Sequence, residues 1–174
     1  MFGHVVLGID PGLTRCGYAV LGMDSSRQPR ALALGVIRTP AAQPLADRLA
    51  EIHDQVDGLI AQFRPSAVAV EQVFFQNNVR TAMGTAQASG VVLALASRAG
   101  CQVVQYTPSQ VKNTVAGWGG ADKEQVGRMV QQRLGLDRMP QPADAADAAA
   151  IALCHCAVAP FVASRDAALA RTRP

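Results

Sequence analysis

Residues 3–12 read GHVVLGIDPG, and the interpretation of the whole chain starts from this stretch. The run is apolar and β-branched, and a Pro-Gly pair closes it. It therefore predicts a buried strand that ends at Asp10 and is followed by a turn. Residues 16–22 (CGYAVLG) and 31–39 predict two further strands. The segments between the three strands are short and contain Gly, Asp, Ser or Pro, as hairpin connections do. The amino-terminal part therefore predicts an antiparallel meander.

The rest of the chain changes to a pattern of helices and strands. Apolar spacing, Gly and Pro predict helices over residues 43–63 and 79–98, a short helix opening at 107–108, helices over 121–134 and from 143 onward, and strands over 67–73 and 101–106. This βββαβαβ order, followed by helices, resembles the ribonuclease-H-like superfamily. The resemblance implies an α/β fold with a five-stranded mixed sheet flanked by helices. A doubly wound dinucleotide-binding fold is not predicted, because no G-x-G-x-x-G follows the first strand.

Length and composition predict one globular domain. The chain has 174 residues, of which 49% are hydrophobic and 17% charged. We expect the ribonuclease-H-like domain over residues 1–160 and a polar, basic and flexible tail over 161–174. No apolar run reaches the roughly 20 residues of a membrane helix, and the amino-terminus lacks the basic region of a signal peptide. We therefore expect a cytoplasmic protein with no membrane partner.

Charge and cysteine content exclude little by themselves. The formal net charge of +3 permits a polyanionic partner without requiring one. Cys154 and Cys156 flank His155, but a zinc site needs a second, distant pair of ligands, and the sequence supplies none. We interpret these thiols, and Cys16 and Cys101, as small apolar residues.

Four carboxylates are placed where they can meet. Asp10 ends the first predicted strand, and Glu71 lies in the fourth. Asp144 and Asp147 are three residues apart on the last helix, so they share one face. Only Ala, Ile and Leu surround them there, so this face should point into the protein. If the first and fourth strands are neighbours, all four carboxylates converge, although helix capping explains part of the role of Asp144.

Such a cluster needs a counterion. Two unpaired carboxylates about 4 Å apart repel by roughly 4 kcal/mol at an effective dielectric constant of 20. Oxygen-only ligands favour Mg²⁺ or Mn²⁺ over Zn²⁺. Two such ions about 3.5–4 Å apart are suited to phosphodiester hydrolysis. The cluster therefore predicts a divalent metal site, with two ions expected.

Five ordered motifs resemble those of the RuvC family of bacterial Holliday junction resolvases, from about residue 4 to 158. They are GIDPG at 8–12 with Arg15 and Gly17-Tyr18 after it, EQVF at 71–74, QVK at 110–112, ADK at 121–123 and ADAADA at 143–148. The resemblance implies a structure-selective endodeoxyribonuclease that resolves Holliday junctions by symmetric, metal-dependent nicking in DNA recombination and repair. It also implies that Asp10, Glu71, Asp144 and Asp147 are the catalytic, metal-binding residues. Its implied partners are four-way junction DNA, a second copy of the chain in a homodimer, and the branch-migration proteins RuvA and RuvB.

The same motifs suggest residues that contact DNA. Phe74 leaves the fourth strand three residues after Glu71, where it could stack on an unpaired base, although core packing is the alternative. Lys112 and Lys123 match family positions near the scissile phosphate, and they are the only lysines in the chain. Arg80 is a further candidate for phosphate binding. His155 is interpreted as a packing residue.

Three other functions compete with this one. The first is another nuclease of the ribonuclease-H-like fold, including relatives that process pre-16S RNA. The second is a non-catalytic nucleic-acid-binding domain, but clustered anions would weaken its binding to phosphate. The third is an ATP-binding domain of the actin and sugar-kinase type, which would need a second Gly-rich loop and a longer chain.

Overall fold

The computed structural model of the chain describes residues 4–73 and 79–171, without the side chains of 79–80 and 161–171. The strands are β1 (Val5–Asp10), β2 (Arg15–Met23), β3 (Pro29–Arg38), β4 (Ala67–Glu71) and β5 (Gln102–Tyr106). The helices are α1 (Leu45–Phe63), α2 (Val79–Arg98), α3 (Pro108–Ala116), α4 (Lys123–Leu134) and α5 (Ala143–Arg171).

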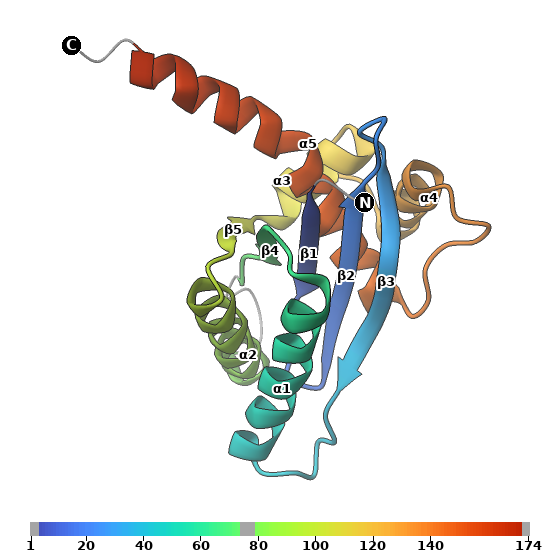
Figure 1. Cartoon of the computed structure of the whole chain (residues 1–174). Helices are drawn as coiled ribbons and strands as arrows, with labels where there is room; N and C mark the ends of the chain where they lie inside the picture. The colour runs from blue at the N-terminus through green and yellow to red at the C-terminus, as the bar shows by residue number, and fades with distance from the viewer. Residues whose placement is uncertain (1–3, 74–78, 172–174) are drawn as a thin grey trace.

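The strands form one mixed sheet in the order β3-β2-β1-β4-β5. β1, β4 and β5 run parallel, whereas β2 is antiparallel to β1, and β3 to β2. Helices α1 and α2 cover one face, and α3, α4 and α5 cover the other (Figure 1). The structure therefore confirms the predicted five-stranded mixed sheet flanked by helices.

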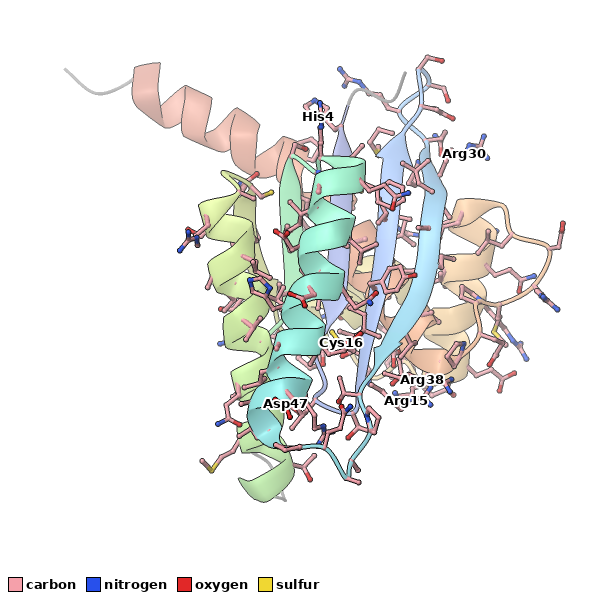
Figure 2. The ribbon with its side chains drawn as sticks, turned by 60° about the horizontal axis from the view of Figure 1, so that its bottom comes forward. His4, Arg15, Cys16, Arg30, Arg38 and Asp47 are labelled. Carbon is pink, nitrogen blue, oxygen red and sulfur yellow. The ribbon has the colours of Figure 1, made fainter. Side chains whose placement is uncertain are left out.

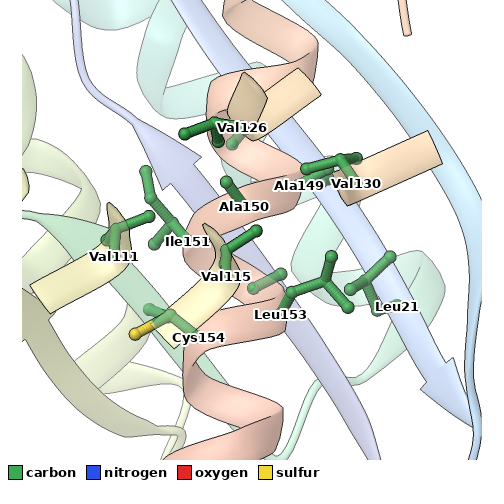
Figure 3. Packing of buried hydrophobic residues seen from close by; sticks show 14 of the residues in the cluster. Leu21, Val111, Val115, Val126, Val130, Ala149, Ala150, Ile151, Leu153 and Cys154 are labelled. Atoms are coloured by element: carbon green, nitrogen blue, oxygen red, sulfur yellow. The ribbon is translucent and has the colours of Figure 1, made fainter. Parts of the chain in front are cut away.

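Side chains of β1 alternate between the two faces of the sheet and contribute to both layers of the core. Leu7 and Ile9 are buried beneath α1 and α2, whereas Val6 is buried beneath α5. Successive side chains of a strand point to opposite faces, so a strand covered on both sides is apolar throughout. Figure 3 shows the α5 side, where Ile151 and Leu153 of α5 pack among side chains from the neighbouring elements.

Helix α5 lies across the sheet and is built mainly from alanine in its first half. By length and composition alone, Ala143–Pro160 is the one candidate membrane span among the described residues. However, Ala145, Ala148 and Ile151 are fully buried against the sheet and the other helices. This segment is therefore the central helix of the core.

The carboxyl-terminal part of α5 differs from the expectation. The sequence predicts a tail from residue 161, whereas the helix continues through Pro160 to Arg171 and projects away from the sheet (Figure 1). Alanine has the highest helix propensity, and four alanines lie between residues 163 and 170. The predicted boundary at 161 thus falls inside a helix.

Candidate active site

Two strand ends supply the first pair of carboxylates. Asp10 is the last residue of β1 and Glu71 is the last residue of β4. The two strands are parallel neighbours, with Ile9 beside Val70 in the register. Both carboxylates therefore leave the same edge of the sheet, as predicted, and both are half-buried.

Two glycines let α5 pack closely against the end of the sheet where these carboxylates lie. Gly17 lies opposite Asp10 in the β1–β2 register, and a Cβ built on Gly17 would lie 2.7 Å from the carbonyl carbon of Asp144. A Cβ on Gly8 would lie 2.8 Å from the Cβ of Ala152. The absence of both side chains lets the α5 backbone touch the sheet. This close contact carries Asp144 and Asp147 to the strand ends.

A cleft of about 280 Å³ opens at the point of convergence. Its charged lining consists of Asp10, Glu71, Asp147, Lys112 and Lys123, which come from β1, β4, α5, α3 and α4. The apolar part of its wall consists of Pro108, Val111, Val126 and Ala150. Three of the four predicted carboxylates and both predicted lysines therefore share one cleft.

The clustered carboxylates hold protons unusually tightly. Burial, together with the negative charges of Glu71 and Asp147, raises the pKa of Asp10 from 3.8 to about 7, against the opposing effect of Lys123. Burial and Asp147 also raise the pKa of Glu71, and both cleft lysines oppose this. The cleft thus contains more negative charge than its own lysines compensate.

Two cations bind the carboxylates of α5. Lys123 Nζ donates to Asp147 Oδ2 at 2.8 Å, and this contact raises the pKa of the lysine. Arg15 Nε donates to Asp144 Oδ2 at 2.9 Å, and this hydrogen bond lowers the pKa of Asp144. Asp144 does not line the cleft. Its charge still contributes to the raised pKa of Asp10, so Asp144 lies near the other three carboxylates while its own carboxylate is paired with Arg15.

The same contacts decide how the carboxylates fit a metal ion. Among residues 4–73 and 79–171, no three His, Cys, Asp or Glu side chains are arranged so that they could hold a metal ion directly. Asp147 is turned towards Lys123, and Asp144 towards Arg15. The donor chemistry of the cleft nevertheless suits Mg²⁺ or Mn²⁺, because its donors are carboxylate oxygens with uncompensated charge.

The remaining predicted residues have varied outcomes. Phe74 lies outside the described residues, and Arg80 is described only as a backbone position near the start of α2. His155 is buried, and its Nδ1 is 2.9 Å from the Tyr106 hydroxyl, which agrees with a packing role. All four cysteines are free thiols.

Sequence reasoning missed the role of Arg15. It starts β2, pairs with Arg38 of β3 in the register, and lies with it at one end of the sheet, far from Arg30 (Figure 2). The available signal was its place between Asp10 and Gly17 in the opening motif. Nothing in the sequence pattern named its partner, Asp144.

Comparisons with known proteins identify the family. Residues 6–155 match the family described as Crossover junction endodeoxyribonuclease RuvC. A relative of that name from Frankia alni is 55% identical over 150 residues, which cover 86% of this chain and 76% of the relative. One from a Parafrankia strain is 51% identical over 169 residues, covering 97% and 95%.

A solved structure agrees with these relatives. The structure of T. thermophilus RuvC in complex with Holliday junction substrate matches with a TM-score of 0.86 and 42% identity. The match covers 91% of this chain and 96% of that one. Fold, motif order and sequence identity all indicate the same family. The chain belongs to the RuvC family of crossover junction endodeoxyribonucleases.

Proposed function

We propose that the cleft hydrolyses phosphodiester bonds of four-way junction DNA, with Asp10, Glu71, Asp144 and Asp147 as its catalytic, metal-binding residues. The observation that carries this proposal is the meeting of three acidic side chains, from three separate elements, in one cleft with two lysines. The raised pKa of Asp10 supports a cation there, since a cation would favour the ionised carboxylate against burial and the neighbouring negative charges.

Nucleases of this family are metal dependent, and we assign Mg²⁺ or Mn²⁺, two ions per site, to the cleft. When bound, such ions activate a water and stabilise the leaving oxygen. Asp10, Glu71, Asp144 and Asp147 would hold them, with Asp144 and Asp147 released from Arg15 and Lys123. The Lys123 ammonium would then be available to a DNA phosphate.

DNA contacts follow from the same geometry. Lys112 and Lys123 project from two helices into one cleft, which suits the approach of a phosphate. Phe74 and Arg80 complete the proposed DNA-binding set, on the grounds of their positions after β4 and at the start of α2. The T. thermophilus relative, by its title, was solved with a Holliday junction, which supports four-way junction DNA as the substrate.

The proposed assembly is a homodimer that acts in the cytoplasm with RuvA and RuvB. A two-fold symmetric dimer presents two identical clefts, and this matches the approximate two-fold symmetry of a four-way junction. Two clefts in one complex would also account for paired, symmetric nicks.

The experiment that tests this function is cleavage of a synthetic four-way junction beside a linear duplex, with Mg²⁺, Mn²⁺ or EDTA. Asp10→Asn, Glu71→Gln and Asp147→Asn keep side-chain shape but remove charge. Each should abolish cleavage and leave junction binding intact or stronger, because anionic repulsion falls. Asp54→Asn, on the exposed face of α1, should cleave normally. Near-normal single-turnover cleavage by any of the first three would remove that residue from the site.

A further inference from the structure

Trp118 is 55% exposed and lies five positions before Lys123, which lines the active-site cleft. It is the sole tryptophan in the sequence. It belongs to the Gly-rich connection between α3, which supplies Lys112 to the cleft, and α4, which begins with Lys123. Trp118 thus lies in the segment that connects the two helices carrying the basic residues of the site.

The connection folds back against α3. A Cβ built on Gly119 would lie 3.1 Å from Ser109 Oγ and 3.2 Å from Asn113 Oδ1. Ser109 follows Pro108, which is part of the cleft wall. Ala121 N also donates to the Trp118 carbonyl at 3.4 Å, so this turn keeps Trp118 close to the start of α4, where Lys123 enters the cleft.

Glycines hold the indole ring in place. Gly117 adopts φ = 87°, a left-handed conformation that ends α3. A Cβ on Gly120 would lie 2.7 Å from Trp118 Cε3 and 2.9 Å from Cη2, so the ring rests against the backbone there. A ring held in this way loses little conformational entropy when it binds a ligand.

We infer that Trp118 stacks on a nucleobase of the DNA strand bound in the cleft. This inference rests on the proposed function and adds a base-binding residue to it. DNA in the cleft would place phosphates on Lys112 and Lys123, and the bases attached to these phosphates would lie about one nucleotide's reach away. An exposed aromatic ring beside a basic groove is the arrangement that binds unstacked bases without sequence preference.

Fluorescence of the single tryptophan tests the contact directly. The full chain is titrated with a four-way junction in EDTA, which prevents cleavage, while anisotropy of a labelled junction arm reports binding independently. We expect Trp118 emission to be quenched along the same binding curve and acrylamide to quench it less in the complex. Binding by anisotropy with unchanged emission and unchanged acrylamide quenching would overturn the inference and leave the proposed function standing.

Variants measure the effect on affinity. Trp118→Ala should weaken junction binding by about fivefold to a hundredfold, and Trp118→Phe should retain most of the affinity. The melting temperature should stay near that of the wild type, because the ring is exposed. Leu45→Ala removes another exposed apolar side chain (42% exposed) on the opposite layer and should bind normally. Normal binding by Trp118→Ala would overturn the inference.

Abasic substitutions identify the base. Each nucleotide within about three positions of the scissile phosphate is replaced in turn by an abasic site. One of them should weaken binding of the wild type and have no further effect on Trp118→Ala. Equal losses for both proteins at every position would contradict stacking. A wild-type protein that neither binds nor cleaves the intact junction would instead overturn the proposed function, and the inference with it.

Discussion

Asp10 is the residue at which the charge of the cleft has its largest energetic effect. Its pKa is about 7 in the folded protein, against an ordinary 3.8. A carboxyl group whose pKa rises on folding is held more tightly by its proton in the folded state, so the fold loses stability as the pH rises from about 4 to about 7. Asp10→Asn removes this loss. In EDTA it should be more stable than wild type at pH 8 by up to about 4 kcal/mol.

Urea unfolding at pH 4.5 and pH 8 measures this difference. The advantage of Asp10→Asn should shrink towards the lower pH, where the wild-type carboxyl is protonated in the folded state. Asp54→Asn is the control, because the Asp54 side chain is 77% exposed and should cost nothing to ionise. Equal stability of wild type and Asp10→Asn at pH 8 would show that ionised Asp10 does not strain the fold.

Lys123 can be separated from other surface cations by salt dependence. If it binds a phosphate, Lys123→Met should flatten the plot of log affinity against log salt by about 0.9. The slope is measured by anisotropy of a labelled junction between about 50 and 200 mM salt, the range in which protein–DNA affinity depends strongly on salt. Arg30→Met is the matched control, since Arg30 also binds an aspartate, Asp24 at 3.2 Å, at the other end of the sheet. An unchanged slope for Lys123→Met would make Lys123 an ordinary surface cation.

At the scale of elements, the close packing of α5 on the sheet positions Asp144 and Asp147, two of the four proposed catalytic carboxylates. Gly17→Ala would place a methyl group within 2.7 Å of the Asp144 carbonyl carbon, so the first turn of α5 has to move outward. A displacement of about 1 Å is enough to lower a rate by roughly a hundredfold. We expect a loss of that order in single-turnover cleavage by a folded protein.

Circular dichroism and junction cleavage of Gly17→Ala test this effect. Gly58→Ala in α1 is the control, because a Cβ there meets nothing within 4 Å. It should cleave normally and gain about 0.5–1 kcal/mol of stability, as Gly-to-Ala changes inside helices do. Wild-type cleavage by Gly17→Ala would mean that the contact does not position the carboxylates.

The elements themselves were largely predictable from the sequence. Breakers mark their ends: α2 agrees with the prediction at both ends, and α1 stops at Phe63, two residues before Pro65. Asp10 and Glu71 were predictable as neighbours, because the carboxyl ends of adjacent parallel strands meet at one edge. The prediction for the end of α5 was wrong, because polar and basic residues predict a tail from 161, whereas the helix continues to Arg171.

The sequence did not predict that Asp147 lines the cleft whereas Asp144 pairs with Arg15. Spacing of three residues places both on one helix face, but it does not say which one reaches the cleft. The partner of Asp144 is Arg15, which lies 129 positions away and is brought to it only by the packing of α5 on β2. Long-range ion pairs of this kind leave no periodic signal.

At the scale of the whole molecule, a cation bound by residues of three elements should stabilise the folded chain. The cleft exists only in the folded chain, so any metal bound there stabilises the fold, by about 2.7 kcal/mol at a concentration of one hundred times Kd. Mg²⁺ or Mn²⁺ should therefore raise the melting temperature of protein prepared in EDTA. Glu71→Gln should reduce the rise, and Asp54→Asn should keep it. No rise at concentrations that support cleavage would contradict a metal site formed by these carboxylates.

The contact of Gly8 and Gly17 with α5 has a consequence for how this protein can vary. Glycine has no smaller replacement, so every substitution at these positions pushes the helix in the same direction, outward. The partners offer no relief, because Gly8 faces the backbone and the Ala152 methyl, and Gly17 faces mainly backbone. Variation at this contact is therefore one-sided: changing Ala152 to glycine would remove only one of the contacts at position 8, the backbone contacts would remain, and only true reversion restores the original spacing.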